Sequence, residues 1–508
     1  KNKNMPGFSF RSNLAALLTA RRWGTLLFPF LGVLLPFLGA LLPLVGVMGL
    51  QASALSSTQG TGDSLSLEQF LARVRQSHPV ITQARILADQ GLTQIQEARG
   101  AMDPRVSFMQ QRKTWEDKLE LGLQDFDLRV PTLLGPDFYV GFDQSEGSKV
   151  NPQSTSQPGG QWKSGIRVPL GREGWINRRR TDLRQAYAMA DMAASQRDNL
   201  INDILLDAAQ DYHRWEASQR QTDIYVEALG IANDVLNFVR YAAEIGERPF
   251  IDTLEAGIQQ RTWQQRLEEA RIKEIEARFA LAVHLWDSLG VNELSRSYRR
   301  SVHAPVLPTP AHLNDSAAYA GYLSEHPRLQ ILRSDIAQQE LELRWLRSRL
   351  LPQLDLEWSL TPLPGSSPSY NIASGGQFTG INLDIPLFLR RERARIERQK
   401  LNITSRQWQL EWTGAGLRQE LERSLQQYNL YRNLLVLQEK LVVENRRMLE
   451  AEKTRFQAGE SNVFILNQRE INLINAEVKV VELQLQQHLN VLQQFHLSGL
   501  MQRYALQP

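Results

Sequence analysis

Two long stretches without proline set the scale of any fold that this chain can adopt. They cover residues 175–245 and 390–458. At 1.5 Å per residue, an α-helix over either stretch would be about 105 Å long, which does not fit a compact globular domain. Each stretch ends at a glycine, Gly246 or Gly459, and a further helical segment follows it. The sequence therefore predicts two very long helices, each paired with a shorter antiparallel helix, in a tube wall or a rod.

The segment after Gly459 carries a heptad seam, in which apolar positions recur at alternating steps of three and four. Its members are Ile471, Ile474, Val478, Val481, Leu485, His488, Leu492 and Phe495. His488 interrupts this apolar series. Since no second histidine or carboxylate stands at ligand spacing beside it, we expect a packed core histidine and predict no metal site.

The chain repeats itself. His78-Pro79 recurs as His326-Pro327, and His284-Leu285 recurs as His496-Leu497. We therefore divide the chain into a first structural repeat, 55–302, and a second, 314–508, joined by a proline-rich linker, 303–313. Each repeat is expected to contain a short helix, two strands, a very long helix and a long helix. Residues 114–160 form an insertion in the first repeat, in which 137–142 could add a strand; its role stays open.

The first residues have the pattern of an export signal. Basic side chains precede an uncharged run at 26–50, and Ala52-Ser53-Ala54 matches the small-residue site that signal peptidase cuts. We predict that residues 1–54 are a signal peptide. The alternative is an inner-membrane anchor, because the run is long enough to span a bilayer; three prolines inside the run argue against it.

Four segments alternate between apolar and polar side chains, as strands with two different faces do. The clearest covers residues 353–361, where Leu354, Leu356, Trp358 and Leu360 alternate with polar residues. Transmembrane barrels and half-buried soluble sheets share this pattern. Export favours the barrel. Four strands cannot enclose a lumen, so a membrane role would require several chains to pool their strands.

Composition excludes several classes of protein. A net charge of +3 argues against a nucleic-acid partner, and the absence of cysteine removes thiolate metal sites and cysteine nucleophiles. The mean hydropathy of −0.36 does not suit a helical membrane protein. Neither a G-x-S-x-G nor an H-E-x-x-H motif occurs. We predict that the chain is not an enzyme and needs no cofactor.

The order of elements, the His-Pro helix starts, the turns at Pro169 and Pro386 and the glycines Gly246 and Gly459 resemble the TolC family of outer-membrane efflux proteins. The resemblance implies a mainly α fold with a small β part. Long antiparallel coiled-coil helices would form an α-barrel, and four strands per chain would contribute to a shared transmembrane β-barrel in a homotrimer. It also implies three kinds of partner, namely outer-membrane lipid, a periplasmic adaptor (membrane fusion) protein, and an inner-membrane efflux pump or ABC exporter.

By the same resemblance, the two helical turns are the periplasmic tips that contact the partners. Their residues are Gly246, Glu247, Arg248, Gly459, Glu460 and Ser461. Family members often carry an aspartate ring just after the second turn, where this chain has Phe464 and Asn467. Asp252 and Glu255 take the corresponding places in the first repeat. We hypothesise that they and Glu460 tune cation access; ordinary helix N-terminal charge is the alternative.

The sequence thus predicts an outer-membrane channel subunit of a tripartite efflux or type I secretion system in a Gram-negative bacterium. It would conduct substrates passively across the periplasm and the outer membrane. The rival interpretation is a periplasmic coiled-coil adaptor or structural protein of the cell envelope, which leaves the strands without a purpose.

Overall fold

The computed structural model describes residues 64–174, 176–287, 290–291, 299–300, 321–361 and 376–504. All of them belong to one unit, residues 61–508. The expected signal peptide, residues 1–54, and the expected linker, 303–313, lie outside the described residues.

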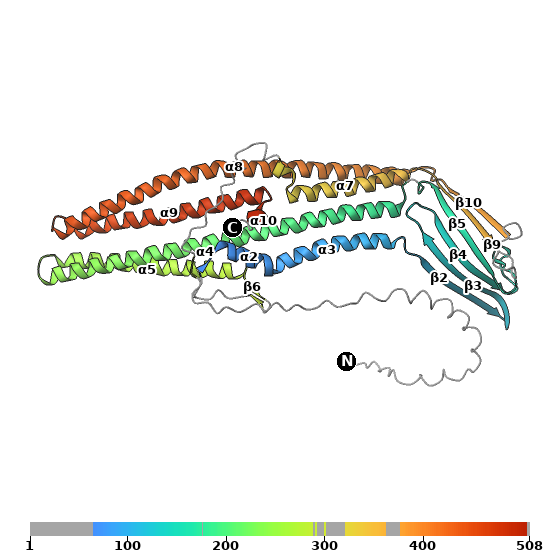
Figure 1. Cartoon of the computed structure of the whole chain (residues 1–508), viewed down its shortest axis with the longest axis horizontal. Helices are drawn as coiled ribbons and strands as arrows, with labels where there is room; N and C mark the ends of the chain where they lie inside the picture. The colour runs from blue at the N-terminus through green and yellow to red at the C-terminus, as the bar shows by residue number, and fades with distance from the viewer. Residues whose placement is uncertain are drawn as a thin grey trace, which may run out of the picture. The chain divides into compact units, whose positions relative to one another are not determined.

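The two very long helices expected from the sequence are present. They are α4 (Arg178–Glu244) and α8 (Arg390–Gln457), of 67 and 68 residues. Each turns back into a shorter helix, α5 (Phe250–Ala282) or α9 (Val463–Leu497), and both hairpin turns lie at the same end of the helical layer (Figure 1). Among the described residues, no helix combines the length with the apolar composition that crossing a bilayer would require.

Shorter helices extend this layer towards the opposite end. In the first repeat these are α2 (Leu67–Ser77) and α3 (Pro79–Gly100), and in the second α7 (Pro327–Ser348); α10 (Met501–Tyr504) closes the chain. Helix α3 packs on α4, while α7 packs on both α4 and α8. The largest buried apolar cluster among the described residues lies where α2, α4 and α9 meet, and it contains Phe70, Tyr212 and Trp215.

The repeat expected from the sequence is visible in matching contacts. His78 and His326 cap α3 and α7 in the same way, each accepting a hydrogen bond at Nδ1 from the backbone N–H two residues on, at 3.2 Å. Each cap precedes a proline in the first helical turn, where the missing N–H costs nothing. The His284 and His496 pair also matches, since Nε2 of each lies within 3.0 Å of an aspartate of α4.

The strands form one antiparallel sheet at the end opposite to the hairpin turns (Figure 1). The sheet contains six strands in the order β10-β9-β5-β4-β3-β2. Their bounds are β2 (Arg105–Trp115), β3 (Lys118–Pro131), β4 (Asp137–Glu146), β5 (Gln161–Gly171), β9 (Gln353–Thr361) and β10 (Gly376–Asp384). Short two-residue pairings elsewhere join β1 (Ser64–Leu65) to β8 (Arg299–Arg300) and β6 (Trp286–Asp287) to β7 (Gly290–Val291).

The expected count of four strands is therefore wrong, because the insertion at 114–160 adds a hairpin, β3–β4, between β2 and β5. The suggestion that residues 137–142 form a strand is confirmed by β4. A two-residue turn at Glu116-Asp117, with φ of 49° and 56°, joins β2 to β3. Positive φ at both positions is the geometry of the type I′ turn, which suits the twist of a hairpin.

The added hairpin is also tied to the helices. Arg179, in the first turn of α4, donates from Nη1 to Asp137 Oδ1 at 2.7 Å and to the backbone oxygen of Thr132 at 3.2 Å. Asn177 caps α4 through its side chain and donates to the backbone oxygen of Leu133 at 3.0 Å. The start of the long helix thus holds the loop between β3 and β4.

Candidate functional site

The six-stranded sheet has one apolar face. Cross-strand neighbours form rows across the sheet, and one row, which crosses β2, β3, β4 and β5, contains Phe108, Phe126, Phe142 and Trp162. Further rows place these apolar side chains on the same face: Val106, Leu128, Val130, Phe138, Val140, Ile166, Val168, Leu170, Leu354, Leu356, Trp358, Leu360, Ile381 and Leu383. Within one chain many remain exposed, Phe108 at 65% and Ile381 at 71%. Farther from the helices the same face is polar, with Gln110, Gln124 and Gln144 in one row. The exposed apolar part of the face indicates contact with lipid or with another protein.

The opposite face of the sheet is polar and carries ion pairs. Lys163 Nζ lies 2.7 Å from Asp143 and 3.4 Å from Asp125, which joins three adjacent strands. Arg167 pairs with Glu357 at 3.1 Å, and the Tyr139 hydroxyl donates to the same carboxylate at 2.9 Å. An apolar outer face and a polar inner face are what the wall of a water-filled transmembrane barrel requires.

Neither edge of the sheet is covered by a further strand among the described residues: β2 forms one edge and β10 the other. Unpaired backbone groups at such edges are costly in a bilayer, because lipid offers no hydrogen-bonding partner. Since the strand number is even and all neighbours are antiparallel, β2 and β10 run in opposite directions. The β10 edge of one copy can therefore pair antiparallel with the β2 edge of another.

At the far end of the molecule, the two hairpin turns have one and the same backbone geometry. Gly246 and Gly459 adopt φ of 81° and 78°. The next residue, Glu247 or Glu460, donates its N–H to the carbonyl five residues earlier at 2.9 Å, and each glycine N–H bonds to the carbonyl three residues earlier. This pair of bonds defines the Schellman motif, whose positive φ favours glycine. The sequence-based assignment of these residues to the turns is correct in position.

Arg248 connects the two turns. Its Nη2 donates to the backbone oxygen of Phe456 at 3.0 Å, and its guanidinium lies 3.9 Å from the centre of the Phe456 ring. Its Nη1 lies 3.6 Å from Asp252, and both side chains are largely buried. Sequence reasoning placed Arg248 at a tip but gave no sign of this contact, because Phe456 belongs to the other repeat.

The acidic residues hypothesised to form a gate lie in different surroundings. Asp252 pairs with Arg248, Glu255 is half-buried one helical step further along α5, and Glu460 is exposed on the second turn. Within the described residues, no hydrogen bond or ion pair joins Glu460 to Asp252 or Glu255. Ser461 instead donates to Glu452, a buried carboxylate of α8.

Large apolar side chains surround the turns. Phe250, Ile251 and Leu254 on α5 are 73%, 69% and 56% exposed, and Phe464 on α9 is 63% exposed. Asn467, the other residue in place of the family's aspartates, is buried. The tips thus present apolar surface, of a kind that marks contact sites between proteins.

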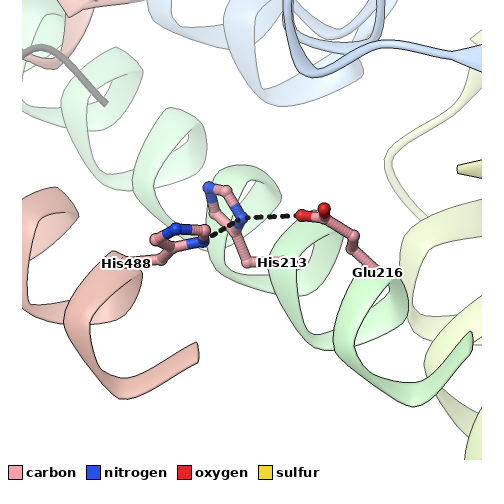
Figure 2. A group of neighbouring side chains, drawn as sticks. All are labelled: His213, Glu216 and His488. Carbon is pink, nitrogen blue, oxygen red and sulfur yellow. Dashed lines mark hydrogen bonds and ion pairs between the residues drawn. The ribbon is translucent and has the colours of Figure 1, made fainter. Parts of the chain in front are cut away.

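A cluster of titratable side chains lies between α4 and α9 (Figure 2). Nδ1 of His213 lies 3.1 Å from Nδ1 of His488 and 3.3 Å from Oε2 of Glu216. His213 and Glu216 are one turn apart on α4, whereas His488 comes from α9. Burial, and then the neighbouring His213, lower the pKa of His488 to about 3. The sequence shows no ligand-type residue at ligand spacing beside His488, because its neighbours His213 and Glu216 lie far away along the chain.

Comparison with known proteins agrees with the fold. Residues 319–499 match the model of the outer membrane efflux protein family. No protein of curated function matches the sequence closely enough to count as a relative.

Solved structures of similar fold include three outer-membrane proteins. The CmeC outer membrane channel of Campylobacter jejuni has a TM-score of 0.60 at 14% identity, over 90% of this chain and 94% of that one. The outer membrane protein VceC of Vibrio cholerae has a TM-score of 0.63 at 12% identity, over 85% and 96%. The MtrE outer membrane channel of Neisseria gonorrhoeae, in its open state, has a TM-score of 0.61 at 14% identity, over 85% and 88%. The resemblance to TolC-like proteins is thus confirmed for the fold of the chain and the sequence of its second half.

Proposed function

We propose that this chain, whose second half matches the outer membrane efflux proteins, is one subunit of an outer-membrane efflux channel. The observation that carries the proposal is the two-faced sheet with open edges at one end of the long helices. Its apolar face suits the lipid of the outer membrane, and its polar face suits an aqueous lumen. The helices then extend the conduit into the periplasm.

The open edges close when three copies assemble. Three times six strands gives an eighteen-stranded antiparallel barrel, where four strands per chain would have given twelve. Barrels of 16 to 18 strands enclose an aqueous channel, and the diameter grows with the number of strands. The lumen within the membrane is thus wider than the sequence alone suggested.

The tips are the proposed docking site for a periplasmic adaptor and an inner-membrane pump or exporter. Exposed Phe250, Ile251 and Phe464 beside the turn residues 246–248 and 459–461 offer the apolar centre that a protein interface needs. The channel itself conducts passively, and the partner supplies the energy. Control of cation access by Asp252, Glu255 and Glu460 remains a proposal; the pairing of Asp252 with Arg248 leaves Glu460 and Glu255 as its stronger candidates.

Planar-bilayer recording tests the proposal. Purified chain added to one side should assemble as trimers and produce stepwise increases in conductance. A chain that stays monomeric and leaves the bilayer electrically silent would contradict the channel. In that case extraction into the soluble periplasmic fraction, without detergent, would support the rival adaptor or structural protein.

A further inference from the structure

The cluster formed by His213, Glu216 and His488 lies within the helices, away from both the sheet and the hairpin turns. The three side chains join α4 of the first repeat to α9 of the second (Figure 2). His213 is fully buried, Glu216 is 5% exposed, and His488 is half-buried. We propose that they form a binding site for one divalent transition-metal ion, Zn²⁺ above all, which fastens the two repeats together.

The spacing of the three ligand atoms fits such an ion. In a tetrahedral zinc site with bonds of about 2.0 Å, two ligand atoms are separated by about 3.3 Å. Nδ1 of His213 lies 3.3 Å from Glu216 Oε2 and 3.1 Å from His488 Nδ1. Each of the three residues offers a ligand atom within 4.8 Å of a ligand atom of the other two. Two imidazole nitrogens and one carboxylate oxygen, with water as the fourth ligand, form a known type of zinc site.

Hydrogen bonds alone do not satisfy the three atoms. If His488 donates its Nδ1 proton to His213, the lone pair on His213 Nδ1 also faces the carboxylate of Glu216. If His213 instead donates its Nδ1 proton to Glu216, the Nδ1 lone pair of His488 faces a proton that is already used in that hydrogen bond. A cation between them accepts a lone pair from each atom, so every one is satisfied at once.

Neighbouring groups orient the site and limit its affinity. Arg220 donates to the other oxygen of Glu216 at 2.8 Å and to Gln484 at 2.8 Å, which leaves Oε2 directed at the histidines. The guanidinium charge opposes a cation nearby. In addition, Nε2 of His213 is buried without a hydrogen-bond partner among the described residues, whereas ligating histidines usually donate from this second nitrogen. We therefore expect micromolar rather than picomolar binding.

The ligand types select among metals. Imidazole nitrogen suits zinc and its transition-metal neighbours, while magnesium and calcium prefer oxygen ligands. The half-buried His488 provides the route of entry. Since α4 and α9 pack along one another, an ion held between them resists separation of the two repeats.

The test is metal binding by the full chain in detergent, without a histidine tag and after removal of metal by a chelator. Calorimetric titration with Zn²⁺ should show one ion per chain, and Zn²⁺ should raise the apparent melting temperature while Mg²⁺ leaves it unchanged. Co²⁺ should give the intense visible absorption of a tetrahedral site.

His488→Gln should weaken Zn²⁺ binding about tenfold or more, in line with the loss of one ligand of three. His326→Asn is the matched control: it removes a buried histidine elsewhere, keeps the capping group and should bind Zn²⁺ as the wild type does. Undiminished Zn²⁺ binding by His488→Gln, or no binding by the wild type, would overturn the site. None of these measurements depends on whether the chain forms a channel.

Discussion

At the scale of single residues, histidine shows how far a sequence can be interpreted. The motif His-Pro at 78 and 326 correctly predicted two helix starts, because a side chain that accepts from the first-turn N–H and a proline at the first position are both local signals. The environment of His488 was not predictable in this way. Its partner His213 lies 275 residues away, and only the packing of α9 on α4 brings them together.

The capping role of His326 makes stability depend on pH. Burial, and then the nearby charges of Arg328 and His496, lower the pKa of His326 from its ordinary 6.5 to about 4. The unfolded chain therefore binds this proton first as the pH falls. The stabilisation is complete above pH 6.5 and is lost as the pH falls towards 4.

Asparagine caps helices equally well without titrating. Between pH 7 and pH 5, the wild type should therefore lose more of its free energy of unfolding than His326→Asn does, with a difference of up to about 2 kcal/mol. Chemical denaturation in detergent at the two pH values, followed by helical circular dichroism, measures the difference. Equal losses of unfolding free energy in the two proteins would contradict the capping role of the neutral His326 imidazole.

Arg248 supports a second prediction at this scale. Arg248→Ala removes the hydrogen bond to Phe456 and the stacking on its ring, so the two turns lose their connection. We expect a cost of about 1–3 kcal/mol, confined to the tips, because the Phe456 carbonyl loses its charged donor and keeps the Gly459 N–H. Amide hydrogen exchange should become faster at Glu247 and Glu460, and single-channel conductance should rise.

Arg240→Ala is the control for this variant, since Arg240 is an exposed arginine in the last two turns of α4, before the hairpin turn that carries Arg248. If exchange at the tips were equally slow in both variants, the turns would be held together by other contacts.

At the scale of elements, the helices were predictable and the sheet was not fully so. The absence of proline over the 67 and 68 residues of α4 and α8 strongly indicates long helices. The glycine that follows each stretch then indicates where the chain turns. Strand β3 gave no clear alternation, because its apolar residues change faces midway: Leu121 and Leu123 lie on one face, and Phe126 and Leu128 on the other. At the end of β3 that lies farthest from the helices, Glu120 pairs with Lys113 and Lys149. Such charged groups are expected where a strand emerges from lipid into water.

Strand β10 allows the two faces to be compared at adjacent positions. Ile381 belongs to the apolar face and Asn382 to the polar one. Ile381→Lys should impair insertion, because a lysine facing lipid costs about 2–4 kcal/mol at the middle of the bilayer. Asn382→Lys, which adds the same charge towards the lumen, should insert normally. Outer-membrane fractionation and trimer migration on gels provide the measurement; equal insertion of the two variants would place both faces in water.

At the scale of the whole molecule, a single chain leaves its sheet unfinished. The two helical hairpins, the even number of strands and the opposite directions of β2 and β10 all suit closure by further copies. The sequence predicted that several chains share one barrel, because the strands of one chain are too few to enclose a lumen. It could not give the barrel size, since that depends on the β3–β4 hairpin lying inside the sheet rather than outside it.

The central claim is that the β2 edge of each copy pairs with the β10 edge of the next. The chain has no cysteine, so introduced thiols report on this contact alone. Val106 and Leu383 both lie on the apolar face, at the ends of the two edge strands nearest the helices. The most direct test is oxidation of the variant Val106→Cys/Leu383→Cys in membranes, with Val106→Cys/Gln377→Cys, whose second thiol lies at the far end of β10, as control. The account predicts covalent trimers from the first variant only; a product that remains monomeric, with both thiols free, would contradict it.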